Sequence, residues 1–388
     1  MDSKKVSIFQ CAPLDSEKYM PMVQSLDEKG MLCRYYGIKY PRVKCKYSNN
    51  RSVLTLIPYV MRRAIIEPLI KLLRLPQYYG YWSEIKMLDY FFSFRIIRDE
   101  SNIIFTSPLF LHTISMAKKM GKIVVVEAGN SEPQREYNRI IEEYKKYNIK
   151  HRYIYGDTIF KDTCLESFGL CDKIVTISKV SNETYLKAGF SKEKLNMIPL
   201  TGTDFPVQSD NLTFGQEKVF ISTAYHNFIK GTHRLLLGWR KAKINNSKLL
   251  IVGRLCEDIN EFIEKYGPFE NVEFIGPRND LRTWYSTHDA VGVLLSLSEG
   301  AVRVTPEMMS FGFPMIVSHD ATCDLVIDGY NGYIIEPTNE DSIADILRWF
   351  SDDWERVHTM RKKVLDSVKK RTMKDWSLDV ADFLSKYA

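Results

Sequence analysis

The sequence predicts an α/β protein with two doubly wound domains, each built on a parallel sheet. Short apolar segments typical of buried strands alternate with helical segments in both halves of the chain. A polar stretch rich in Gly, Pro, Asn and Asp, Thr201–Gln216, separates the halves as a linker would. The chain has 388 residues, which is enough for two separate cores.

In the first half, two helical segments are followed directly by a glycine, as helix C-termini commonly are. The expected strands are Val6–Gln10, Ile103–Thr106, Ile123–Val126, Asp172–Ser178 and Asn196–Leu200, and the expected helices are Leu109–Met120 and Asn182–Ala188. Alternation of this kind predicts a parallel sheet covered by helices.

The second half alternates more regularly and ends in amphipathic helices. Its expected strands are Lys218–Thr223, Lys248–Val252, Val272–Ile275, Ala290–Leu295, Met315–Ser318 and Tyr333–Ile335. Its expected helices are Thr232–Ile244, Asp258–Tyr266, Asp280–Tyr285, Pro306–Phe311, Ser342–Phe350, Trp354–Lys370 and Trp376–Tyr387. This pattern predicts a second doubly wound domain.

Composition limits the partners. The chain is 45% hydrophobic and 26% charged, as globular proteins are, with a formal net charge of +6. This mild basic excess suits an acidic small molecule or an anionic surface, and without an arginine-rich tract it does not predict nucleic-acid binding. The seven cysteines are scattered without a C-x-x-C pair, which favours reduced thiols and a cytoplasmic location. We expect no signal peptide, because the N-terminus leads straight into a strand.

Neither half contains the usual phosphate-binding loops. G-x-G-x-x-G and G-x-x-x-x-G-K-[ST] are both absent from the sequence. Two nucleotide-type domains are therefore predicted without the loop of an NAD or NTP site.

A pair of glutamates draws attention to the segment Ser296–His319. Glu299 follows a buried strand and so emerges at the carboxyl edge of the sheet, where ligands of parallel sheets bind. Thr305 and the proline after it read as the start of a helix whose first turn contains Glu307. Backbone N–H groups at that helix start would suit phosphate oxygens, and the two carboxylates would accept hydrogen bonds from sugar hydroxyls.

Plainer explanations exist for each of these side chains. The helix dipole alone favours an acidic residue such as Glu307 in a first turn. Arg303 could simply neutralise one of the two carboxylates. Glu299 is harder to explain this way, because a carboxylate directly after a buried strand is costly unless it is paired or lies in a cleft.

The segment EGAVRVTPEMMSFGFP resembles the E-x7-E motif of retaining glycosyltransferases of family 4, which have the GT-B fold. The flanking HDAVGVLL and MIVSHDATCDLVIDGYNGYIIEP, and the earlier DKIVTISKVSNETYLKAGFSKEKLNMIPLTGTDF, are similar to the family's elements in the same order. The similarity extends roughly from Asn102 to the C-terminus. It implies an N-terminal acceptor-binding domain of residues 1–205, a donor-binding domain of residues 206–373, and a last helix, residues 374–388, that returns to the first domain.

The resemblance implies roles for individual residues. Glu299 would contact hydroxyls of the donor sugar, Glu307 the ribose, and Lys230 in HNFIKGTHRL the donor phosphates. A lysine ahead of a helix suits anions on physical grounds as well. The implied catalytic residues are Glu299, Lys230 and Arg303. The implied donor-binding residues are Glu307, Val302, Val304, Thr305, Gly253, Arg254, Gly276, Pro277 and Arg278, and those on the acceptor side are Glu127, Gly129 and Asn130.

The sequence departs from the family pattern at three places. Tyr225 stands where the family usually has an arginine, whose charge Arg254 or Arg303 could replace. Val302 replaces the second glycine of the motif and restricts the backbone there. EAGNSE follows the third expected strand where a histidine is frequent, so Glu127 could serve as an acid or base there, or could make a structural hydrogen bond.

The resemblance implies transfer of a sugar from a nucleotide diphosphate sugar to a glycan or a lipid-linked glycan, with retention of configuration. A UDP-sugar is favoured by family frequency, and a GDP-sugar is the alternative. No cofactor is expected, and the absence of a D-x-D motif predicts no need for metal. The setting would be synthesis of a surface polysaccharide or glycoconjugate. A catalytically silent partner subunit and a related sugar-nucleotide enzyme, such as an epimerase, are the alternatives.

The segment 51–98 is the least family-like part of the chain. Leu54–Leu75 is apolar with four interspersed basic residues, and an aromatic-rich stretch, Tyr78–Phe92, follows. Such a segment fits a peripheral contact with the inner face of the plasma membrane. It fits equally an ordinary core helix with one solvated face, which we take as the expectation. The aromatic side chains could also stack on acceptor sugars.

Overall fold

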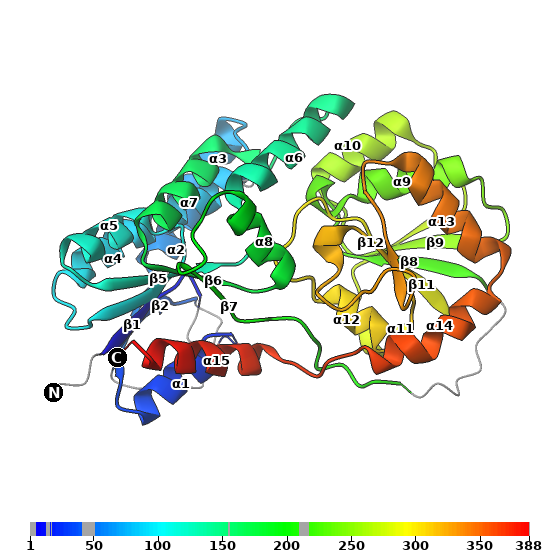
Figure 1. Cartoon of the computed structure of the whole chain (residues 1–388). Helices are drawn as coiled ribbons and strands as arrows, with labels where there is room; N and C mark the ends of the chain where they lie inside the picture. The colour runs from blue at the N-terminus through cyan, green and yellow to red at the C-terminus, as the bar shows by residue number, and fades with distance from the viewer. Residues whose placement is uncertain are drawn as a thin grey trace.

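The computed structural model contains two parallel β-sheets, one in each half of the chain (Figure 1). It describes residues 5–12, 16, 18–40, 51–153, 156–208 and 217–387. The linker predicted at Thr201–Gln216 therefore lies partly outside the described residues.

The first sheet has seven strands in the order β3-β2-β1-β4-β5-β6-β7, all parallel. The strands are β1 Val6–Phe9, β2 Leu32–Ile38, β3 Ser52–Thr55, β4 Ile103–Thr106, β5 Ile123–Ala128, β6 Lys173–Thr176 and β7 Leu195–Met197. The helices of this half are α1 Met20–Glu28, α2 Ile57–Met61, α3 Glu67–Leu72, α4 Tyr78–Ile96, α5 Leu111–Lys119, α6 Pro133–Tyr147, α7 Thr158–Leu170 and α8 Lys179–Lys187, with a π-helical turn, Arg62–Ile66, joining α2 to α3.

The second sheet has six strands in the order β10-β9-β8-β11-β12-β13, again all parallel. The strands are β8 Val219–Thr223, β9 Lys248–Val252, β10 Val272–Gly276, β11 Ala290–Leu294, β12 Met315–Val317 and β13 Gly332–Ile334. The helices are α9 Thr232–Ala242, α10 Glu257–Tyr266, α11 Leu281–Tyr285, α12 Val304–Met309, α13 Glu340–Asp352, α14 Glu355–Asp366 and α15 Met373–Ser385.

The strand order creates one switch point in each sheet. In the first sheet β1 lies between β2 and β4, and in the second sheet β8 lies between β9 and β11. Connections leave in opposite directions from such a strand, so a crevice opens at the carboxyl ends of the two neighbours. These two crevices are where ligand sites are expected.

The two doubly wound sheets confirm the predicted fold class, and most predicted elements are present with boundaries shifted by a few residues. Strands β2 and β3 and helices α1, α6 and α7 are additional to the prediction. Of these, α6 had a sequence signal in Glu132 followed by Pro133, because the Glu132 side chain caps the helix and proline is favoured in a first turn.

The expectation of a core helix in the segment 51–98 is wrong for its first part and correct for its second. Across α2, the π-turn and α3, the structure buries just Pro58 and Ile70. Helix α4, in contrast, buries Ile85, Leu88, Phe92 and other residues against the first sheet. The apolar residues of 57–72 are therefore largely exposed, although their abundance suggested a core.

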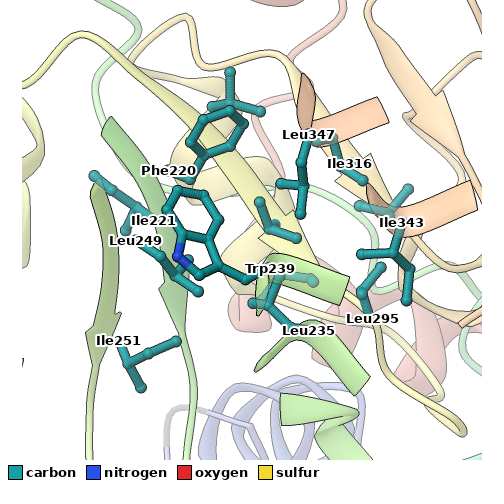
Figure 2. Close-up of a cluster of buried hydrophobic side chains, with 14 of the residues drawn as sticks. Phe220, Ile221, Leu235, Trp239, Leu249, Ile251, Leu295, Ile316, Ile343 and Leu347 are labelled. Atoms are coloured by element: carbon teal, nitrogen blue, oxygen red, sulfur yellow. The ribbon is translucent and has the colours of Figure 1, made fainter. Parts of the chain in front are cut away.

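The core of the second half is built around Trp239 of α9. Figure 2 shows its indole ring beside Phe220 of β8, with Leu249, Ile316 and Leu347 from other elements nearby. The ring centroids of Trp239 and Phe220 are 5.4 Å apart in an edge-to-face arrangement. Burial of such large rings supplies much of the stabilisation of a domain of this kind.

Helix α6 belongs to this second core although it follows β5 of the first sheet. Ile140, Tyr144 and Tyr147 are buried in the same cluster as Trp239. The Tyr144 ring stacks on Phe228 with centroids 4.6 Å apart. Figure 1 shows α6 extending from the first half towards α10.

Buried charges fix the same helix to α9. The Glu143 carboxylate accepts two hydrogen bonds of 2.6 Å from the Arg234 guanidinium and contacts His233 at 2.7 Å. Burial alone would raise the pKa of Glu143, but the bonds from His233 and Arg234 lower it to about 2. Helix α6 therefore connects the halves through apolar and ionic contacts together.

The last helix, α15, packs against α1 near the N-terminus (Figure 1). Trp376, Val380 and Leu384 are buried in one cluster with residues of the first sheet. Among the described residues, no helix is both long enough and apolar enough to cross a membrane.

Candidate active site

Lys230 is placed by the loop that follows β8 at the switch point of the second sheet. The Asn227 side chain accepts a 3.0 Å hydrogen bond from the Lys230 backbone N–H and closes a short 3-10 turn. Gly231 then takes φ of +66°, and a Cβ atom there would lie 1.9 Å from the Leu295 carbonyl oxygen. The K-G pair is thus explained by packing, because no other residue fits beside the neighbouring strand.

Glu299 is delivered by the loop after β11, the neighbour of β8. Its carboxylate contacts the Lys230 ammonium group and accepts a 2.9 Å hydrogen bond from the Ser296 hydroxyl. The residue is 8% exposed, and a buried carboxylate of this kind needs such partners. The structure therefore brings together two of the three predicted catalytic side chains.

The backbone around Glu299 is held by the first half of the chain. The Ser131 hydroxyl donates a 2.9 Å hydrogen bond to the Glu299 carbonyl, and the Ser178 hydroxyl donates to the Gly300 carbonyl. A Cβ atom on Gly300 would lie 2.1 Å from the carbonyl oxygen of Gly129. Gly129, predicted on the acceptor side, is thus in backbone contact with the glutamate loop.

The helix after this loop begins earlier than predicted. It runs from Val304 to Met309, and Thr305 is not its N-cap, because the Thr305 hydroxyl donates a 2.7 Å hydrogen bond to the Ala321 carbonyl. Packing against that loop outweighs the capping preference of threonine. Val302 is buried, with an ordinary backbone conformation outside the left-handed region. The missing glycine therefore causes no strain at this position.

Glu307 lies in the first turn of α12, next to Arg303. The carboxylate is 3.7 Å from the Arg303 guanidinium, which also contacts Asp204 at 3.4 Å. Burial and the charge of Asp204 raise the pKa of Glu307 to about 7, although Arg303 opposes the shift. Arg303 thus neutralises Glu307, as one of the plainer explanations held. Within the described residues, its ion pairs are with Asp204 and Glu307 and not with Glu299.

The loop after β9 lies beside the Lys230 loop. Gly253 has φ of +128°, and a Cβ atom there would lie 1.9 Å from the Ala224 carbonyl oxygen. Arg254 is exposed, with its guanidinium 5.7 Å from the centre of the Tyr225 ring. A positive charge is therefore present next to the position where the family usually has its arginine.

The loop after β10 lies beside the loop after β9. The Gly253 N–H donates a 2.9 Å hydrogen bond to the Gly276 carbonyl, which joins the two loops. Pro277 follows, and Arg278 forms an ion pair with Asp280 at 2.7 Å. Gly276 therefore lies against the loop after β9, while Arg278 is held by a neighbour in its own loop.

A cavity of about 300 Å³ opens at the switch point of the first sheet. Glu127, Gly129 and Asn130, all predicted on the acceptor side, are among its lining residues. The Glu127 carboxylate contacts the Lys18 ammonium group and accepts a 2.8 Å hydrogen bond from the Tyr19 hydroxyl. Its structural role is thus evident, while the side chain still borders the cavity.

Glu136 of α6 was missed by the sequence reasoning, because no motif marks it. It lines the cavity, is 3% exposed, and accepts a 2.7 Å hydrogen bond from the Ser298 hydroxyl, one residue before Glu299. Burial raises its pKa to about 7, and the charge of Glu299 adds to the shift. Within the described ranges, no three His, Cys, Asp or Glu side chains gather as a metal site requires.

The comparison with known families concerns the second half of the chain, which contains Lys230 and Glu299. Residues 206–366 match the model of glycosyl transferases group 1. The chain carries a glycosyl transferases group 1 domain. A curated relative, an uncharacterized glycosyltransferase of Haemophilus influenzae, is 26% identical over 175 residues, which are 44% of this chain and 48% of the relative. The chain thus matches about half the length of that relative.

Solved structures with the same fold cover nearly the whole chain. Sucrose-phosphate synthase from Thermosynechococcus elongatus is 15% identical with a TM-score of 0.65, and covers 99% of both chains. Anabaena HepE in complex with UDP is 13% identical with a TM-score of 0.61, over 98% of this chain and 100% of HepE. The lipopolysaccharide outer core galactosyltransferase WaaB is 14% identical with a TM-score of 0.60, over 98% and 99%. The protein therefore has the GT-B fold.

Proposed function

We propose that this protein is a retaining glycosyltransferase that moves a sugar from a nucleotide diphosphate sugar to a glycan or lipid-linked glycan. The proposal rests chiefly on one observation, the contact of Lys230 with the buried Glu299 at the switch point of the group 1 domain. A cation and a carboxylate at that edge suit a donor that has both phosphates and sugar hydroxyls.

The donor would occupy the crevice between the loops after β8, β9, β10 and β11. Lys230 would bind the diphosphate, with Arg254 supplying the charge that Tyr225 lacks. Glu307 would accept hydrogen bonds from the ribose, and Gly276 and Pro277 would border the base. UDP is the first nucleotide to test, because Anabaena HepE was crystallised with UDP and with UDP-glucose.

In the reaction, the bond between the anomeric carbon and the diphosphate oxygen breaks while the acceptor oxygen bonds to the same face of the sugar. The acceptor hydroxyl proton passes to the departing diphosphate. Lys230 would stabilise the negative charge that develops on that group, and Glu299 would orient the sugar through its hydroxyls. Such preorganised charges typically contribute more to the rate than any other effect.

The acceptor would enter through the cavity of the first sheet, which is bordered by Glu127 and Glu136. Glu136 is the better placed of the two, because the Ser298 hydroxyl connects it to the loop that carries Glu299. As a carboxylate it would accept a hydrogen bond from the acceptor hydroxyl and position the oxygen for attack. Glu127 is already held by Lys18 and Tyr19 and would shape the cavity.

A thermal-shift panel with UDP, GDP, ADP and CMP, each with Mg²⁺ and with EDTA, tests the donor site first. A ligand at 100 times its Kd stabilises a protein by about 2.7 kcal/mol, which raises the melting temperature by a few degrees. We expect one nucleoside diphosphate to do so equally in EDTA. If no nucleotide raises the melting temperature, and the protein hydrolyses neither UDP-sugars nor GDP-sugars, the proposal is contradicted. That result would favour a silent partner subunit.

A further inference from the structure

The segment 57–75 has an apolar outer face that no other described element covers. Helix α2, the π-turn and α3 form one continuous helical stretch. Its inner side carries the buried Pro58 and Ile70 and the half-buried Arg62, whose guanidinium is 2.7 Å from Glu84 of α4. Between 37% and 77% of the surface of each large apolar residue on the outer side is exposed. These residues are Ile57, Val60, Met61, Ile65, Leu69, Leu72, Leu73 and Leu75.

The π-turn keeps four of these side chains on a single face. In an α-helix, successive side chains point in directions about 100° apart around the axis. Side chains four residues apart therefore differ in direction by about 40°. A π-turn takes in roughly one extra residue and rotates the following helix back by about 100°. Residues spaced by four, Ile57, Met61, Ile65 and Leu69, therefore stay aligned across the turn, as do the inner Pro58, Arg62 and Ile70.

The edge of this face is basic. Arg63, Lys71 and Arg74 are exposed beside the apolar residues, and Glu67 is the one acidic residue of the segment. Arg63 forms an ion pair with Glu67 at 2.6 Å, whereas no carboxylate partner of Lys71 or Arg74 is found within the described residues. These two line a cavity of about 610 Å³.

From this combination we propose that residues 57–75 dock the protein onto an anionic lipid bilayer. An exposed apolar face of this length is unusual for a soluble surface and marks an interaction site. Its basic edge complements anionic headgroups, and a helix with an apolar face and flanking lysine and arginine lies in the plane of a bilayer surface. The docking is independent of the transfer reaction.

Docking in this orientation would bring a basic opening to the headgroups. The cavity lined by Lys71 and Arg74 is also lined by Lys150 and by Arg254 of the donor crevice. Under the proposed function, this opening would face the phosphate of a lipid-linked acceptor held in the same bilayer. The bilayer contact itself needs no acceptor, so the two ideas can fail separately.

Flotation of the purified full-length protein with lipid vesicles tests the docking. The vesicles are phosphatidylcholine alone, or phosphatidylcholine with one-third phosphatidylglycerol, at low and at high salt. We expect binding to the anionic vesicles that weakens at high salt. The double variant Leu69→Gln, Leu72→Gln removes two exposed apolar side chains and should reduce binding by about tenfold or more. Lys71→Glu with Arg74→Glu should abolish the preference for anionic lipid.

The control is the double variant Ile159→Gln, Ile327→Gln, which replaces two apolar residues elsewhere that are 53% and 57% exposed, against 48% and 77% for Leu69 and Leu72. It should float like the unmodified protein. Absence of binding to anionic vesicles at low salt would overturn the proposal, as would unchanged binding of the Leu69, Leu72 variant. So would light scattering that shows a dimer which this variant dissociates, since the face would then cover a second copy.

Discussion

Glu136→Gln is expected to stabilise the protein above pH 7 and to slow transfer at the same pH. The Glu136 carboxyl is buried between the two crevices, where burial and Glu299 raise its pKa from 4.5 to about 7, while Ser298, Lys230 and Arg135 oppose the shift. A shift of about 2.5 units corresponds to about 3 kcal/mol of unfolding free energy. The folded state holds this proton more tightly than the unfolded chain does. The associated stability is therefore complete below pH 4.5 and is lost as the pH rises to about 7.

Glutamine keeps the size of the side chain and an oxygen that can accept the hydrogen bond from Ser298, but it has no charge to bury. The variant should unfold with nearly the free energy of the unmodified protein at pH 4.5. At pH 8 its free energy of unfolding should be higher by up to about 3 kcal/mol. Urea denaturation at both pH values, followed by tryptophan fluorescence, measures the difference. Glu142→Gln, an exposed position on the same helix, is the control and should show no such pH dependence.

Activity separates a positioning role from a structural one. If Glu136 orients the acceptor as a carboxylate, the variant gains stability at pH 8 yet loses transfer, and the unmodified enzyme gains activity as the pH rises through about 7. A stability difference that is equal at both pH values would refute the reasoning about burial. Full transfer by Glu136→Gln across the pH range would refute the positioning role.

Three further predictions test the site and the packing around it. Glu299→Gln should abolish transfer while the affinity for the nucleoside diphosphate changes by no more than a few-fold, and normal turnover would exclude the assigned role. Gly231→Ala should lower the melting temperature by several degrees because its Cβ would overlap a carbonyl oxygen, whereas Gly169→Ala, in an open position of α7, should be neutral or slightly stabilising. Glu143→Gln should cost about 3 kcal/mol at pH 7, because the buried Arg234 would keep Glu340 as its ion-pair partner but lose the closer carboxylate. Urea denaturation should show that this loss shrinks as the pH falls towards 2.

The sequence was sufficient to predict the two sheets and the positions of Lys230 and Glu299 after buried strands, because the apolar strand segments stand out clearly. The roles of the two side chains remain predictions. The start of α12 was predicted wrongly, because Thr305 and Pro306 resemble a helix cap. In the structure, the Thr305 hydroxyl instead donates a hydrogen bond to the carbonyl of Ala321 in a later loop. Hydrogen bonds between residues far apart in sequence leave no local signal.

Glu136 is a second residue whose surroundings could not be predicted from the local sequence. Its proposed role rests on the hydrogen bond from Ser298, which lies 162 positions away, and on its burial. The segment 57–75 was misjudged for a related reason. Apolar residues spaced by four predict an amphipathic helix, but whether the apolar side faces a core depends on what packs there. In the structure, Pro58 and Ile70 pack against the rest of the protein, while the other large apolar side chains of the segment are exposed.

Helix α6 follows the first sheet in sequence but packs in the core of the second half. This arrangement limits how chimeric proteins can be designed. If the N-terminal half binds the acceptor, as proposed, exchanging that half between relatives is a way to change acceptor specificity. Here the exchange would also replace Tyr144, Tyr147 and Glu143 of α6, whose side chains pack in the core of the second half and pair with a buried arginine there. A chimera that takes residues 133–149 and the second half from the same parent keeps both kinds of contact. The part of the chain that has to be exchanged as one piece is therefore larger than residues 206–366.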